Sequence, residues 1–332
     1  MAFRFLHVST LVVLAAAVPA MGCAVGTGDD GDAPAARTAE GVIMGEDGPE
    51  EIEYAIADDG TAMIGDISIG PAAEVPEIAR DDHTSSAEGL GLPRRSGSLW
   101  GFGRVPYEIA SGADASEVRK AMHHWHEATG GAVTFVERTG QRNFVRFTTG
   151  PRSYCYAPIG QAIGRHDVAL RPPSAGGVCA YSEALHELGH VLGLDHEMQR
   201  ADRDAHVTIH WDNIQKGFAS AFTKAKGERN YGAYDFASIM HYDSSFFSKN
   251  GGPTVTHKDG ARIHWEGTLS GEDVTTVKQM YSLQKCGFGQ HGFAIGSCVI
   301  NPAGEGTQCK DDGSWSQPTA CAKPAWDFRW GS

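Results

Sequence analysis

His-Glu-Leu-Gly-His-Val-Leu-Gly-Leu-Asp-His-Glu, residues 186–197, is the stretch that decides the fold of this 332-residue chain. His186 and His190 stand four residues apart, so on a helix they lie one turn apart on one face. Two imidazoles in that arrangement can hold one zinc ion. Glu187 projects beside them and is placed to take a proton from a water molecule. The stretch therefore predicts a helix that carries metal ligands and a base.

The end of this helix is predicted at Gly193, which lacks a Cβ and can take a positive φ. The turn would bring His196 in as a third ligand. Three protein ligands with one open position are typical of a catalytic zinc site, whereas structural sites usually close with four. Such a metal polarises a carbonyl, and Glu187 could act first as general base and then as acid toward a leaving amine. The predicted chemistry is amide hydrolysis with one Zn²⁺ per chain.

A plainer interpretation is an amphipathic helix whose polar face happens to carry histidines. Its core-facing stripe would consist of Leu185, Leu188, Val191 and Leu192. This stripe predicts a helix under either interpretation. The positions of Gly193 and His196, at the spacing of the long zinc motif, favour the metal site.

The motif resembles that of the metzincins, in which a methionine turn follows, here Ser-Ile-Met-His-Tyr at 238–242. Glu197, directly after the third histidine, makes the chain similar to the astacin branch from about residue 99 to about 285. The resemblance implies an α+β, two-lobed catalytic domain with a mixed sheet and a zinc-binding active-site helix. Further matching segments are 99–100, 105–107, 200–204 and 207–209.

The resemblance also implies roles for individual residues. Met240 would form an apolar floor beneath the metal, and Tyr242 would be an extra zinc ligand that swings away and donates a hydrogen bond to the oxyanion. Glu197 would meet the new N-terminus of the processed chain. Cys155 and Cys179 would form a disulfide. From the residues alone, the alternatives are a packed tyrosine at Tyr242 and a routine surface charge at Glu197.

Charge is concentrated in one segment. The net charge is −13, which argues against a nucleic-acid partner. Between Ala24 and Leu90 stand 17 acidic residues and two arginines, so the rest of the chain is near neutral. The hydrophobic share of 41% is that of an ordinary globular chain.

Residues 1–22 are expected to be a signal peptide, with an apolar run too short to span a bilayer. Cys23 follows directly and resembles the acceptor site of a bacterial lipoprotein, so we expect either membrane attachment through a lipidated Cys23 or ordinary secretion. The seven cysteines leave one unpaired, which fits Cys23. The predicted location is extracellular or the outer cell envelope.

Residues 23–95 are predicted to be an acidic tether and pro-segment. Their composition at 24–60 is too polar for a packed core. Met-Ile-Gly-Asp at 63–66 resembles the astacin pro-segment, in which an aspartate, here Asp66, is a zinc ligand in place of water. Met63 stands where the family has Phe, and the alternative is a Gly-Asp turn in a disordered tail. Processing is expected between Asp82 and Leu99, with Arg94-Arg95 as a dibasic candidate.

The catalytic domain is predicted to span 96–285. Strands are expected at 105–109, 133–136 and 143–148, and helices at 113–127 and near 271–283. Residues from Cys155 to about Gly160 resemble the family's edge strand, to which an extended peptide could add by main-chain hydrogen bonds; alternatively this strand only closes the sheet. His123, His124 and His126 point in different directions and are interpreted as solvated or packed.

The remaining tail, 286–332, is predicted to be a small disulfide-rich module. Its four cysteines allow three pairings, and the segment from Asp312 to Cys321 resembles the end of a sushi module. That resemblance implies the pairs Cys286–Cys309 and Cys298–Cys321. The tail is expected to bind protein or glycan, or only to cap the enzyme.

Together these observations predict a secreted or lipid-anchored zinc endopeptidase, made as a latent precursor, that cleaves extended protein segments. One rival is a binding or adhesion protein that uses the protease fold as a scaffold. Another is a zinc hydrolase acting on a non-peptide bond. The sequence does not indicate which side chains the substrate carries.

Overall fold

The computed structural model describes residues 37–45, 48–75, 99–113, 115–151, 154–161, 164–225 and 230–282, with short strands at 92–93, 284–288, 291–294, 298–300 and 306–308. Across these residues, every helix is too short or too polar to cross a bilayer. The expected signal peptide, Cys23 and the Arg94-Arg95 site lie outside the described residues.

The first lobe contains a four-stranded parallel sheet with the order β7-β6-β8-β9. Its strands are β6 (Arg104–Ile109), β7 (Thr134–Glu137), β8 (Phe144–Thr148) and β9 (Arg165–Ala169). Beyond β9, Tyr156 pairs with Ala169 in an antiparallel bridge, which makes the sheet mixed, as the resemblance implies. The expected edge strand is shorter than predicted, because only isolated bridges at Tyr156 and Ala157 form there.

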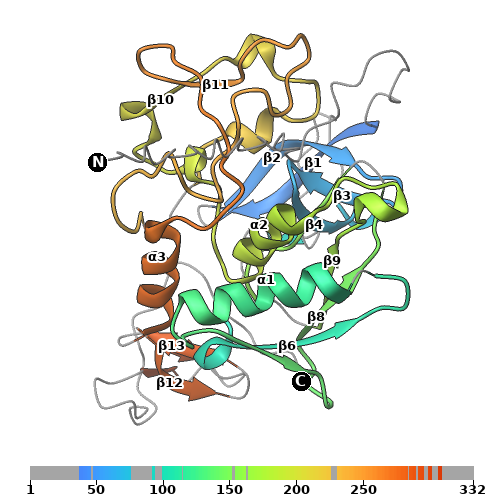
Figure 1. Cartoon of the computed structure of the whole chain (residues 1–332), viewed down its shortest axis with the longest axis vertical. Coiled ribbons are helices and arrows are strands. Elements are labelled where there is room, and N and C mark those ends of the chain that lie inside the picture. The colour runs from blue at the N-terminus through green and yellow to red at the C-terminus, as the bar shows by residue number, and fades with distance from the viewer. Residues whose placement is uncertain are drawn as a thin grey trace, which may run out of the picture.

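Two helices form the centre of the molecule, α1 (Ala115–Ala128) and α2 (Tyr181–Val191). Figure 1 shows them next to each other, with the sheet strands β6, β8 and β9 beside them. Trp125 of α1 is fully buried and its indole N–H donates to the Leu185 carbonyl of α2 at 3.0 Å. The predicted apolar stripe of α2 is buried. One face of the helix therefore packs into the core, and another face is available for the histidines.

The second lobe begins where Gly193, with φ of 100°, turns the chain away from α2. It is rich in loops and contains the antiparallel pair β10 (Val207–Ile209) and β11 (Val255–His257), followed by α3 (Gly271–Ser282). The single-turn 3₁₀ helices of the described chain are Ala72–Glu74, Gly101–Gly103, Pro173–Ala175, Glu197–Gln199, Arg203–Ala205, Trp211–Asn213 and Ala219–Phe222. The helix α3 confirms the helix that the sequence predicts near 271–283.

The prediction that residues 24–60 form an unfolded tether is wrong for 37–56. Residues 37–71 form four antiparallel strands, and a short strand joins them in parallel, giving the order β4-β3-β2-β1-β5. The strands are β1 (Arg37–Gly45), β2 (Gly48–Ile56), β3 (Thr61–Ile64), β4 (Ile67–Pro71) and β5 (Leu92–Pro93). Ile43, Ile52 and Tyr54 are buried, so a few well-spaced apolar side chains outweigh the acidic composition. We call residues 37–75 the pro-sheet.

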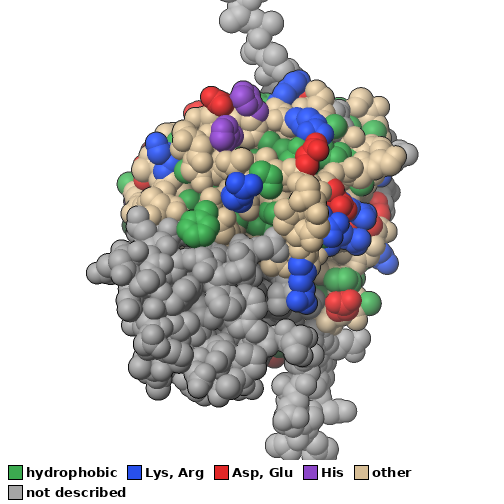
Figure 2. Space-filling model, turned by 90° about the horizontal axis from the view of Figure 1, so that it is seen from below, with side chains coloured by type: hydrophobic (Ala, Val, Ile, Leu, Met, Phe, Trp, Pro, Cys, Tyr) green, Lys and Arg blue, Asp and Glu red, His purple; other side chains and the backbone are tan. Residues whose placement is uncertain are grey.

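Cys155 and Cys179 form a disulfide, as the resemblance implies. The tail forms two hairpins, from β12 (Gln284–Phe288) with β13 (His291–Ala294) and from β14 (Cys298–Ile300) with β15 (Gly306–Gln308). Each predicted sushi-type pair includes Cys309 or Cys321, and both of these lie outside the described residues. On the face shown in Figure 2, acidic and basic side chains are interspersed.

Candidate active site

The three motif histidines converge at the end of α2. His186 and His190 lie one turn apart on the helix, and the Gly193 turn brings His196 back toward them. All three are buried, with at most 3% of their surface exposed. The Nε2 atoms of His190 and His196 are 3.2 Å apart. The structure therefore brings together the three histidines that the sequence predicts as metal ligands.

Hydrogen bonds at the other ring nitrogen fix the tautomer of each histidine. Nδ1 of His186 lies 2.7 Å from the Ile239 carbonyl, and Nδ1 of His190 lies 2.8 Å from the Leu194 carbonyl. Carbonyl oxygens only accept, so both Nδ1 atoms must carry the hydrogen. His196 Nδ1 lies 3.2 Å from Oε1 of Gln199. In the neutral rings, each Nε2 therefore presents a lone pair to the common centre.

Asp66 of the pro-sheet completes this centre. It lies in the turn between β3 and β4, and its carboxylate oxygens lie 3.1 Å from His186 Nε2, 2.8 Å from His196 Nε2 and 3.7 Å from His190 Nε2. Burial alone would raise its pKa. The three imidazoles that face the carboxylate outweigh burial and hold the pKa of Asp66 well below its ordinary value. Asp66 is thus an anion among three imidazoles.

The four residues fit a zinc ion. One donor atom from each of Asp66, His186, His190 and His196 lies within 4.8 Å of all the others. Two donors on a tetrahedral zinc, at bond lengths of about 2.0–2.1 Å, lie roughly 3.3 Å apart. The separations in this cluster bracket that value. Three lone pairs and a carboxylate that point at one centre need a cation between them, and nitrogen and oxygen donors suit zinc.

Glu187 lies beside this centre with its charge uncompensated. It is fully buried, and both carboxylate oxygens accept no hydrogen bond from the residues that the structure describes. Burial, followed by repulsion from the Asp66 carboxylate, raises its pKa well above the ordinary value. A carboxyl group that holds its proton more tightly than usual is suited to receive a proton and release it again.

Met240 and Tyr242 approach the centre from the methionine turn. Met240 is 2% exposed and packs against α2 at Gly189, where an added Cβ would lie 2.5 Å from its sulfur. The Tyr242 hydroxyl donates to Oδ1 of Asp66 at 3.0 Å. The tyrosine therefore points at the metal centre from the second lobe, and Met240 lies under α2, which we call the zinc helix.

Two residues that the sequence did not single out hold these groups in place. Asp273 of α3 accepts hydrogen bonds from the Ser238 hydroxyl at 2.6 Å and from the Ile239 N–H at 2.8 Å. Gln199 Nε2 donates to the Ala221 carbonyl, which turns Oε1 of Gln199 toward His196. The three-residue spacing from His196 to Gln199 was a weak local signal, whereas nothing near residue 273 in the sequence indicates its contact with the methionine turn.

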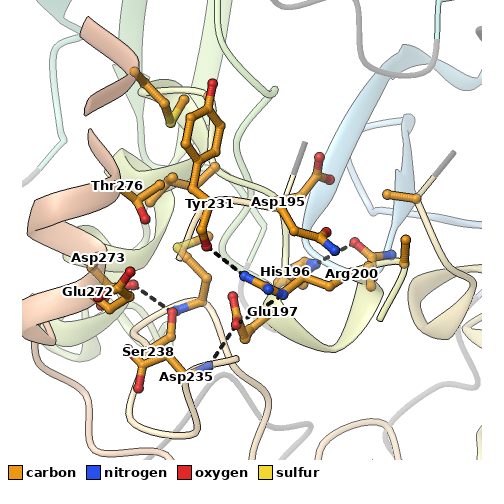
Figure 3. Close-up of a pocket in the computed structure, with 18 of the residues that line it drawn as sticks. Asp195, His196, Glu197, Arg200, Tyr231, Asp235, Ser238, Glu272, Asp273 and Thr276 are labelled. Carbon is orange, nitrogen blue, oxygen red and sulfur yellow. Dashed lines mark hydrogen bonds and ion pairs between the residues drawn. The ribbon is translucent and has the colours of Figure 1, made fainter. Parts of the chain in front are cut away.

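Glu197 lies away from the metal centre, in a cavity of about 300 Å³. Figure 3 shows it on the cavity wall with Asp235, Asp273 and Arg200. Its Oε1 accepts from the Asp235 N–H at 2.8 Å and lies 3.5 Å from Arg200 Nε. Burial raises its pKa to about 7. Glu197 is therefore a partly buried acid facing an open space, and its carboxyl lies apart from the three motif histidines.

Comparison with known proteins places this arrangement in one family. Residues 94–282 match the model of the astacin family of peptidases. The zinc metalloproteinase nas-6 of Caenorhabditis elegans is 34% identical over 197 residues, which cover 55% of this chain and 54% of that protein. Bone morphogenetic protein 1 of Xenopus laevis is 37% identical over 202 residues, 57% of this chain and 28% of that protein.

Among solved structures, high choriolytic enzyme 1, a hatching enzyme zinc-protease of the medaka Oryzias latipes, is 30% identical with a TM-score of 0.47, covering 54% of this chain and 89% of that one. The chain spans about half the length of the first curated relatives it matches. The matched region includes the zinc helix, the third histidine and the methionine turn. The chain belongs to the astacin family, with the metzincin fold.

Proposed function

We propose that this chain is a zinc-dependent endopeptidase, exported and made as a latent precursor. One observation carries the proposal: three imidazole lone pairs converge on one centre, beside a buried carboxylate that has no hydrogen-bond donor among the described residues. A purely structural zinc site needs no such base, whereas hydrolysis needs a group that moves a proton. The zinc-metalloproteinase names of the relatives support the same class of reaction.

Each side chain then has a role in peptide hydrolysis. His186, His190 and His196 would hold one zinc ion, which when bound polarises a carbonyl and makes water more acidic. Glu187 takes a proton from water and passes it to the leaving amine. The Tyr242 hydroxyl, which reaches the centre, donates a hydrogen bond to the carbonyl oxygen as that oxygen gains negative charge.

The substrate is proposed to be an extended segment of protein chain. The main chain of Ala157 already pairs with an extended segment. The Ala157 carbonyl accepts a hydrogen bond from the Ser68 N–H at 3.0 Å, and the Ala157 N–H donates to the Asp66 carbonyl at 3.2 Å. A substrate strand could use the same two groups once the pro-sheet leaves. Unfolded or flexible segments supply such backbone most readily.

Latency is proposed to arise from Asp66, which fills the position where water must react. Asp66→Ala is therefore expected to give an uncleaved chain that hydrolyses peptides. The measurement is peptidase activity of the intact variant, with integrity checked by mass. Activity as low as that of uncleaved wild type would contradict this role for Asp66.

After processing, we propose that the new amino group enters the cavity beside Glu197. Oδ2 of Asp235 lines this cavity region without a hydrogen-bond donor among the described residues. An ammonium group would compensate both acids. Export through residues 1–22, attachment through Cys23 and binding by the tail remain part of the proposal, supported by the sequence patterns alone.

Glu187→Gln tests the catalytic role directly. The amide keeps the size of the side chain but cannot take up the proton, so the processed variant should retain one zinc per chain and lose at least about 10²-fold in peptide hydrolysis. Metal analysis and digestion of a peptide library give the two readings. Full activity of this variant, or wild-type chain that binds zinc and cleaves no peptide, would refute the proposed function.

A further inference from the structure

We propose that the two lobes on either side of Asp66 form a binding surface for the excised pro-sheet, so that cutting the chain after Arg95 does not by itself release it. The occupant is this chain's own segment 37–75. The inference rests on the proposed function for its activity readout, and on contacts of the described residues for the binding itself. Activation would then require dissociation or a second cut within the sheet.

The interface between the pro-sheet and the catalytic domain is an apolar core. Ile43, Ile52 and Tyr54 of the pro-sheet belong to one continuous buried cluster with residues of both lobes, including Phe218 and Phe222. Met63 is fully buried in a second cluster with Tyr156 and Ala169. Interfaces that continue a domain core are typical of lasting association, whereas transient contacts are more polar.

On the first lobe, the pro-sheet makes hydrogen bonds with the edge of the parallel sheet. Beside the main-chain pairing at Ala157, the Tyr156 hydroxyl donates to Oδ2 of Asp59 at 2.6 Å. The same hydroxyl lies 3.1 Å from Oγ1 of Thr61. These bonds involve groups that stay with the pro-sheet and groups that stay with the enzyme, so they do not depend on the covalent linker.

On the second lobe, different strands of the pro-sheet make contact. The Ser220 hydroxyl donates to the Glu53 carbonyl of β2 at 2.8 Å. Thr38 of β1 packs so closely on Gly217 that a Cβ there would collide with its methyl group. Gly65 fits against Tyr242 and Ala221, where a Cβ would lie 2.5 Å from the tyrosine hydroxyl. The sheet thus contacts both lobes, with Asp66 between them.

Cutting the chain between the pro-sheet and the catalytic domain removes only the high effective concentration that covalent attachment provides. While attached, the pro-sheet is present at an effective concentration of roughly millimolar. After the cut, the apolar core, the Tyr156 bonds, the Ser220 bond and the Asp66 carboxylate all remain. We therefore expect a bimolecular complex that persists at micromolar protein and dissociates on dilution.

The experiment uses the full chain with a recognition sequence for a site-specific protease inserted between Arg95 and Ser96, so that the cut leaves Ser96 first. After complete cutting at micromolar concentration, size-exclusion chromatography should show the pro-fragment eluting with the catalytic unit. Activity per molecule should be low there and rise on dilution. Tyr156→Phe should weaken the complex roughly five- to tenfold, as expected for one or two lost hydrogen bonds.

Tyr107→Phe is the matched control, because it removes a phenol hydroxyl in the same lobe whose hydrogen-bond donor is Arg119 of α1. It should leave the complex unchanged. A pro-fragment that elutes separately at micromolar concentration, with full activity at once, overturns the inference. If the separated catalytic unit cleaves no peptide, the proposed function fails, and co-elution still decides whether the sheet binds in trans.

Discussion

Gly189 lies between the two helical histidines and leaves the space that Met240 fills. An added Cβ would lie 2.5 Å from the Met240 sulfur, closer than packed atoms approach. Gly189→Ala is expected to lower the free energy of unfolding by about 1–3 kcal/mol, because overcrowding outweighs the gain in helix propensity. It should also weaken zinc binding, since the displaced turn carries the carbonyl that orients His186. Denaturant unfolding and zinc titration measure the two effects.

Gly271→Ala is the control for that change, since it is also a helical glycine but has open space around its Cβ position. Its stability should stay the same or rise by up to about 1 kcal/mol. Equal unfolding midpoints for the two variants would show that Met240 moves aside freely and does not act as a packed floor.

At the level of elements, α3 positions the methionine turn through hydrogen bonds to Asp273. This buried carboxylate accepts from Ser238, from Ile239 and from the Ser270 N–H at the start of its own helix. The Ile239 carbonyl in turn orients His186. Asp273→Ala is expected to cost about 2–4 kcal/mol of stability by leaving buried donors unpaired. It should also weaken zinc affinity about 10–100-fold through the loosened ligand support.

Competition with a chelator and chemical denaturation provide these two measurements. Lys278→Ala, an exposed change on the same helix, should alter neither. Loss of stability with unchanged zinc affinity would mean that Asp273 supports the fold without positioning the ligand.

The elements differ in how far the sequence predicts them. The zinc helix and its turn are predictable because all their determinants, from Leu185 to His196, lie within one local pattern of spacing. Asp273 lies 87 residues after His186 in the numbering, and no local rule connects a helix start to a remote turn. The contact forms only when α3 packs, so the sequence gives no sign of it.

The sequence does not predict the pro-sheet, for a different reason. Composition averages over a window, and acidic residues dominate the window from 24 to 60. Burial is decided by individual positions, and Ile43, Ile52 and Tyr54 are enough to anchor a hairpin of two nine-residue strands on an existing core. The hairpin needs that core, because an isolated two-stranded hairpin is only marginally stable. Its fold therefore depends on the catalytic domain more than on its own sequence.

For the whole molecule, the pro-sheet is expected to control how fast metal leaves the site. In the uncleaved chain, Asp66 adds a fourth donor and the cluster is almost completely buried. Zinc should therefore transfer to an excess of chelator at least roughly tenfold more slowly from the uncleaved chain than from the processed one, which corresponds to about 1.4 kcal/mol. Uncleaved Asp66→Ala separates two causes, because it keeps the covering sheet and lacks the carboxylate. A rate between the other two assigns part of the protection to ligation and part to burial. Equal rates for the cleaved and uncleaved wild-type chains would mean that the pro-sheet neither binds nor shields the metal.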